Sequence, residues 1–424
     1  MKLYPLLLVF VLLGFQNAYG EEPKKQNFKE TLSSFIKEAK SKNPEISEGK
    51  NRINIFKEIP PQAGSLKDPQ LMLGLVNLPV NSFSFRQEAM TQKQIQISQK
   101  FPFPGTLSLR VQAADQDVSI AKANHDDVIL KIVREVKTTF YELFYINSTI
   151  EITRQNKVLM KQFITIAEGK YSVGKGIQQD VLKAQVELSK IMDELIELNQ
   201  LKQAESAKLN VLMNRLPQAE LNIPHGLTQS PFKFKLEKLQ KMAENKRPFL
   251  KAIKSSIDKF KIKKQLAEKK YYPDFNVSLR YGQRQDSMVA SHPDFVSAFV
   301  GINIPIWHKT KQSRKVSEEN FRIQTFRDVY NKAKNQIFLG IKIALDKEAK
   351  GSKLIKLIKS GIIPQARQSL ESALAAYSVD KVDFLTLIDN QVTLLKWEIK
   401  YHRELTDYEQ NLAMLENLVG KELF

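Results

Sequence analysis

Four short segments of the chain alternate apolar and polar residues, and this alternation predicts β-strands. The pattern is clearest in residues 275–281 and 296–304, where every second position is apolar and the residues between are mostly polar or small. Residues 71–78 and 94–101 follow it less regularly. A polar loop links the two members of each pair. The sequence therefore predicts two strand pairs that are far apart along the chain.

The long stretches outside the strand pairs place apolar residues every three or four positions, which predicts helices. Residues 107–168 contain no proline and would form a rod on the order of 90 Å long. The other expected helices are 28–40, 177–216, 232–270, 310–376 with a kink at Pro364, and 383–423. The Pro- and Gly-containing stretch 60–69 is expected to break the first helical region.

The order of these segments occurs twice in the chain. Tyr171-Ser172-Val173 in the first half returns as Tyr377-Ser378-Val379 in the second, and each triplet stands between two helical stretches. A repeat of about 200 residues is far longer than the unit of a solenoid. We therefore expect one large structure over residues 21–424, made of two similar halves at about 28–225 and 230–424.

Residues 1–20 have the features of a signal peptide. Lys2 precedes an apolar run at 6–13, and Ala18-Tyr19-Gly20 offers small residues at the cleavage positions. The run is shorter than the roughly 20 residues that a spanning helix needs. Removal after Gly20 is expected, with an uncleaved anchor as the alternative. No later segment approaches the apolar length of a transmembrane helix, so an exported protein without such helices is predicted.

The formal net charge is +19, and the chain contains no cysteine. The absence of cysteine rules out disulfides, thiolate metal ligands and a lipid-modified N-terminal cysteine. A basic chain can bind nucleic acid. Here the lysines are spread through every helical stretch, which is typical of solvated helix faces. We therefore predict no nucleic-acid partner.

The alternating strands fit two kinds of sheet. One is an ordinary half-buried sheet, and the other is a transmembrane β-barrel, with one strand face toward lipid and the other toward water. The smallest membrane barrels have about 8 strands, so four strands cannot close one. In the second case several copies of the chain must pool their strands, because an open sheet edge inside lipid leaves backbone groups unpaired. The barrel interpretation thus predicts a homo-oligomer around a pore.

Several motifs resemble those of the TolC-type outer-membrane efflux proteins, over nearly the whole mature chain. The first turn-and-helix motif is Tyr171-Ser172-Val173-Gly174-Lys175-Gly176 with residues 180–185. The second is Pro364-Gln365-Ala366 with Ala376-Tyr377, Leu387-Ile388-Asp389 and Gln391. The entry to the third strand is Tyr272-Pro273-Asp274-Phe275. Asn77-Leu78-Pro79 and residues 99–105 are similar to the branch that exports heavy-metal cations.

This resemblance implies a mainly α fold with a small β part. Long α-helical hairpins would form a periplasmic tunnel, and four strands per chain would contribute to a trimeric twelve-stranded transmembrane barrel. The implied protein is the passive exit duct of a tripartite efflux pump, located in the outer membrane and extending into the periplasm. Its implied partners are two further copies, a periplasmic adaptor, an inner-membrane pump and outer-membrane lipid.

The resemblance also points to a channel gate near the second turn. Asp389 matches a carboxylate that lines the narrowest ring in the family, and Thr386 lies one helical turn earlier, where some relatives have a second acid. A ring of three Asp389 carboxylates would favour cations. Tyr377 could donate its hydroxyl to a neighbouring coil, or serve only in packing. Some relatives have an arginine at the position of Val382, beside Lys381, so the locking contacts expected here differ.

The hairpin tips are the expected contact with the adaptor. Gly174, Lys175 and Gly176 form the first tip, and Asp380 belongs to the second. Glycine at 174 and 176 also suits the left-handed backbone that ends a helix, so a purely structural role is the alternative.

No metal site, cofactor site or catalytic site is predicted. The histidines are scattered, and none is paired at ligand spacing. The chain has no nucleophile elbow, phosphate-binding glycine loop or HExxH motif. The competing hypothesis is a periplasmic adaptor or scaffold built on coiled helical hairpins. Adaptors usually have one hairpin in a β-rich body, whereas two hairpins with two strand pairs favour the duct.

Overall fold

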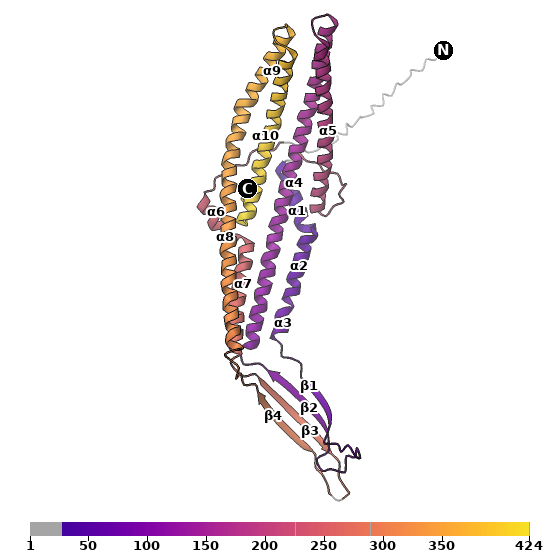
Figure 1. Ribbon diagram of the computed structural model, residues 1–424, viewed down its shortest axis with the longest axis vertical. Helices are drawn as coiled ribbons and strands as arrows, with labels where there is room; N and C mark the ends of the chain where they lie inside the picture. The colour runs from indigo at the N-terminus through magenta and orange to yellow at the C-terminus, as the bar shows by residue number, and fades with distance from the viewer. Residues whose placement is uncertain (1–27, 225, 289, 424) are drawn as a thin grey trace, which may run out of the picture.

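Two antiparallel helical hairpins lie side by side, and a four-stranded sheet continues them at one end (Figure 1). The computed structural model describes residues 28–224, 226–288 and 290–423. The predicted signal peptide, 1–20, lies outside the described residues. The division into two sequence repeats stays a prediction.

The sheet is antiparallel with strand order β1-β2-β3-β4. Its strands are β1 Gln70–Val76, β2 Gln92–Phe101, β3 Phe275–Arg284 and β4 Phe295–Ile302. The four predicted strands are confirmed to within a few residues. The central pair, β2 and β3, joins segments that are far apart in the sequence. The two predicted strand pairs therefore form one sheet.

The register places most of the apolar residues of the four strands on one face, whereas Met72, Val76, Phe295 and Phe299 belong to the other. Leu73 lies opposite Ile95, Ile95 opposite Tyr281, and Tyr281 opposite Val296. Residues that lie directly opposite share a face, and successive residues point to opposite faces. The apolar face is open, since Leu73 is 69% exposed and Val300 is 74% exposed. On the polar face, Ser278 is only 6% exposed. The sheet thus exposes its apolar side.

The long helices form the two hairpins. The first pairs α4, Thr106–Ser172, with α5, Gln178–Leu212. The second pairs α8, Gln312–Leu357, and α9, Ile363–Ser378, with α10, Phe384–Val419. A five-residue π-helical segment, η1 Ile358–Ile362, precedes Pro364 and gives the expected irregularity in this rod. Proline has no N–H and its ring crowds the preceding turn, so a widened turn relieves the clash.

The shorter helices correct two expectations. Residues 60–69 were expected to break the helix, but Pro60 and Pro61 lie in the first turn of α3, Ile59–Gly64, where a missing N–H costs little. Residues 232–270 were expected to form one helix. They form α6, Leu236–Lys246, and α7, Pro248–Lys269, because a residue before proline favours extended backbone and Arg247 adopts it.

Two further helices, α1 Phe28–Lys42 and α2 Pro44–Lys57, pack on the middle of α4. Phe140 of α4 is fully buried there, in edge-to-face contact with Phe28 and Phe35 of α1. Apolar packing continues toward the hairpin tips, where α4, α5, α9 and α10 share one core cluster. None of the described helices has both the length and the apolar character needed to cross a membrane.

Candidate functional site

The two hairpin tips lie at the same end of the molecule, far from the sheet (Figure 1). At the first tip, the Lys170 carbonyl accepts hydrogen bonds from the N–H groups of Lys175 and Gly176, at 2.9 and 3.0 Å. Gly174 has φ +75°, which glycine adopts without a steric penalty. A Cβ at Gly176 would lie 3.1 Å from the Lys170 Cβ. These contacts fix a tight turn between α4 and α5.

The second tip is built in a similar way without glycine. Asp380 has φ +60°, and the Lys381 N–H donates to the Ala376 carbonyl at 2.9 Å. Asp383 caps α10, because its Oδ1 accepts from the Thr386 N–H at 2.8 Å. A carboxylate at this position also interacts favourably with the positive end of the helix dipole.

Lys170 connects the two tips. Its ammonium group pairs with the Asp380 carboxylate and lies 4.7 Å from the centre of the Tyr377 ring. The hydrogen bond from Lys170 lowers the pKa of Asp380 below its ordinary value. Lys381, which we expected at the gate, is exposed, and the ion pairs among the described residues do not include it. We call Lys170, Tyr377 and Asp380 the tip clamp.

Tyr377 is part of the core beneath the clamp. Its ring is buried and lies 5.5 Å from the Phe384 ring. Its hydroxyl is buried and has no hydrogen-bond partner among the described residues. Burial raises the pKa of Tyr377, and the nearby Asp180 and Asp380 carboxylates add to the effect. A buried hydroxyl without a partner is costly, and donation of this group to a neighbouring coil stays a prediction.

Asp389 and Thr386 lie one turn apart on α10, and both are exposed. The intervening Leu387 and Ile388 are buried in the core cluster of the tips. Thr386 and Asp389 therefore point away from the packed side of α10. The lining of a constriction by these two side chains stays a prediction.

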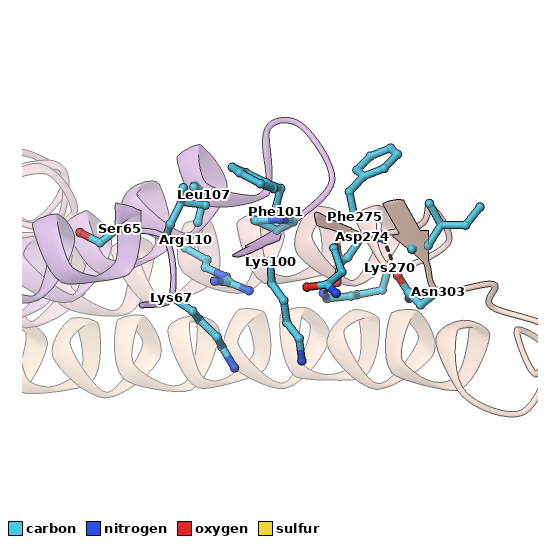
Figure 2. A pocket seen from close by; sticks show the side chains of 15 residues that line it. Ser65, Lys67, Lys100, Phe101, Leu107, Arg110, Lys270, Asp274, Phe275 and Asn303 are labelled. Atoms are coloured by element: carbon cyan, nitrogen blue, oxygen red, sulfur yellow. Dashed lines mark hydrogen bonds and ion pairs between the residues drawn. The ribbon is translucent and has the colours of Figure 1, made fainter. Parts of the chain in front are cut away.

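A cavity of about 500 Å³ lies where the strands meet the helices (Figure 2). Four of its lining residues are basic, namely Lys67, Lys100, Arg110 and Lys270. Figure 2 shows Lys67 and Lys100 extending in the same direction. The lining includes one carboxylate, Asp274, which accepts from Lys270 Nζ and from the Phe103 N–H, each at 3.0 Å. The cavity therefore carries a net positive charge.

Among residues 28–224, 226–288 and 290–423, no group of three or more His, Asp or Glu side chains is arranged to hold a metal ion. The hairpin tips and the sheet are therefore the two candidate functional regions of the described chain. Exposed apolar strands, a basic cavity behind them and long helical rods define an outer-membrane channel fold.

Comparison with known proteins agrees with this class. Residues 35–215 match the family model described as "Outer membrane efflux protein". The cobalt-zinc-cadmium resistance protein CzcC of Cupriavidus metallidurans is 21% identical over 317 residues, covering 75% of this chain and 74% of CzcC. The first hairpin of this chain therefore resembles the outer membrane efflux protein family.

Solved structures share the fold at low sequence identity. The outer membrane protein VceC of Vibrio cholerae superposes with a TM-score of 0.78 at 17% identity, covering 92% of this chain and 96% of VceC. The channel CusC gives a TM-score of 0.77 at 14% identity, with 92% of each chain covered. The fold class predicted from the sequence is therefore confirmed.

Lys170 is the tip residue that sequence reasoning missed. It lies directly before the Tyr171-Ser172-Val173 motif, but its partner Asp380 lies 210 positions away. The one sequence signal that the two tips lie side by side is the similarity between the two turn sequences.

Proposed function

We propose that three copies of this chain form a passive exit duct in the outer membrane. The observation that carries the proposal is the exposed apolar face of the sheet, which extends over all four strands. An apolar face of this extent is costly in water and stable against acyl chains. The polar face of the same strands would then line an aqueous lumen.

The open edges of the sheet support an oligomer. In the described part of the chain, β1 and β4 each have only one neighbouring strand, so one edge of each is unpaired. Unpaired edges inside lipid leave N–H and C=O groups without partners. Pairing β4 of one copy with β1 of the next satisfies both edges, and three copies give twelve strands. The number of copies, three, is taken from the resemblance to the TolC-type proteins.

The helical hairpins would form the periplasmic tunnel, with the tips at its inner end. There Asp389 and Thr386 are proposed to line the constriction, and the tip clamp holds the two hairpins of each copy together. The tip turns, with Gly174, Lys175, Gly176 and Asp380, are proposed to contact a periplasmic adaptor and, through it, an inner-membrane pump. The chain itself would catalyse no reaction.

Heavy-metal cations are the proposed cargo class, because the relative CzcC is named for cobalt, zinc and cadmium resistance. Deleting the chain should sensitise cells to a subset of metals when metals, dyes and antibiotics are compared on one panel. Complementation with the intact chain is the control. Sensitivity confined to dyes or antibiotics would contradict the metal assignment and leave the duct in place.

The gate is tested by single-channel recording in planar bilayers. Asp389→Ala should enlarge the conductance and weaken block by multivalent cations, because it removes the proposed ring of three carboxylates. Asp193→Ala on α5 is a matched control, since Asp193 is also an exposed carboxylate. Unchanged conductance and unchanged block in the Asp389 variant would remove this residue from the gate.

The tip clamp is tested in the same recordings. Lys170→Met should raise the time spent in open states, because it removes both the ion pair and the cation–π contact that join the tips. Lys161→Met removes an exposed lysine of α4 that lies outside the ion pairs of the described residues, and it should behave as the native channel. Equal gating in all three proteins would contradict a locking role.

A soluble periplasmic adaptor is the alternative function. Fractionation distinguishes the two: a duct remains in the outer membrane until detergent is added and migrates as a heat-labile trimer. Recovery in the periplasmic fraction without detergent would favour the adaptor.

A further inference from the structure

The four strands have an unusual charge composition. They contain four basic residues, Lys93, Lys100, Arg280 and Arg284, and no aspartate or glutamate. Three of the four, Lys100, Arg280 and Arg284, belong to the polar face by the strand register. Lys93 belongs to the apolar face, because it lies opposite Leu75 and Gln283.

Side-chain contacts confirm where the arginines lie. The Arg280 guanidinium donates to Gln96 Oε1 at 2.9 and 3.1 Å and lies 5.0 Å from the Phe299 ring. Both partners are on the polar face. Arg284 lies 3.9 Å from the ring of Phe295 on the same face. These contacts hold two fixed positive charges above the polar side of the sheet.

Two of the carboxylates near the ends of the sheet, Asp274 and Asp294, are already engaged. Asp274, at the helical end, is held by Lys270 and the Phe103 N–H. Asp294, at the other end, accepts from the Tyr281 hydroxyl and, at 2.8 Å, from the Arg284 N–H. Among the described residues, neither Asp274 nor Asp294 forms an ion pair with Lys100 or Arg280. At the helical end, Lys67 and Arg110 in the cavity extend the positive charge.

We propose that the barrel section of the duct attracts anions, so that anionic solutes concentrate in it and polyanions block it from the outer side. The inference rests on the proposed function, which turns the polar face toward the lumen. Each copy contributes three inward basic residues, of which Arg284 lies beside the Asp294 carboxylate, and a trimer contributes nine. Rings of Arg and Lys favour anions in pores, and low-dielectric walls strengthen their field.

The experiment uses inorganic tripolyphosphate as a blocker of single channels in planar bilayers. The polyanion is added to each compartment in turn. Block from the compartment that faces the barrel is expected in the native trimer, because the proposed Asp389 constriction is at the opposite end and repels polyanions. The double variant K100Q/R280Q keeps hydrogen-bonding side chains and should require at least tenfold more tripolyphosphate.

Lys93→Gln is the control for position, because it removes one positive charge per copy from the opposite face of the same sheet. It should be blocked as the native channel is. Heat-labile trimer migration checks that each variant has assembled. Conducting channels that tripolyphosphate does not block, or a K100Q/R280Q variant blocked as strongly as the native one, overturn this inference and leave the duct standing. A preparation without conductance overturns both proposals.

Discussion

The buried ion pair between α4 and α10 gives a quantitative test of how the two hairpins are joined. Lys137 Nζ lies 2.5 Å from Glu416 Oε2, and the two side chains are only 10% and 6% exposed. Glu416 Oε1 also accepts from the Leu423 N–H at 2.9 Å. Removing one partner of such a pair leaves a buried charge uncompensated and costs roughly 3–5 kcal/mol, whereas removing both charges is often nearly neutral.

We therefore expect Lys137→Met to lower the free energy of unfolding by about 3 kcal/mol. The double variant K137M/E416Q should lose only about 1 kcal/mol, because the side-chain amide introduced at position 416 keeps an acceptor for the Leu423 N–H. Urea unfolding of the detergent-solubilised protein, followed by far-UV circular dichroism, measures the difference. Protein and detergent concentrations are held fixed, because oligomer stability depends on them. Glu416→Gln alone is measured beside them, and a double variant that loses at least as much as the two single variants together would show that the two charges do not stabilise each other.

Three further predictions concern the helices. Phe140→Ala should cost about 3–5 kcal/mol in the same urea assay, because it empties a fully buried site between Phe28 and Phe35, and an unchanged midpoint would contradict this. The hydrogen bond from Arg215 lowers the pKa of Glu38 from 4.5 to about 2. This pair therefore stabilises the fold fully above pH 4.5, and its contribution is lost as the pH falls toward 2. Glu38→Gln should flatten the plot of unfolding free energy against pH in this range, and a plot identical to that of the native protein would exclude a contribution from the pair. Gly174→Ala should destabilise the first tip by about 1 kcal/mol and speed its proteolysis, because φ there is +75°, whereas Gly169→Ala in α4 should not.

The strands and long rods could be predicted from the sequence because their patterns are local. In β3 and β4, residues alternate because one face of the sheet is apolar. Along α4, apolar residues recur with a period of about 3.6 because one side of the helix is buried. The ends of these elements were predicted to within a few residues. The predictions at prolines were wrong. Pro60 and Pro61 lie in the first turn of α3, whereas Pro248 separates α6 from α7 in a segment predicted as one helix. The same residue type stops or starts a helix according to its place in the turn.

The contacts of the candidate site could not be predicted in the same way. Lys170 with Asp380, and Lys137 with Glu416, join residues more than 200 positions apart, and no spacing rule connects them. The family resemblance directed attention to Lys381 and Val382, where relatives have an arginine. In this chain the cation at the tips comes from the other hairpin. Which residue fills that position depends on how the hairpins pack, and packing is not encoded in a local period.

In the proposed duct, one face of the sheet contacts acyl chains and the other lines water. The chain has no cysteine, so single cysteines can be introduced at Leu73 and Val300 on the apolar face, and at Gln96 and Ser297 on the polar face. Each is labelled with an environment-sensitive fluorophore in the reconstituted protein and exposed to spin-labelled lipid or to aqueous iodide. We predict quenching by lipid at Leu73 and Val300 and by iodide at Gln96 and Ser297. Quenching by iodide alone at all four positions would contradict the account.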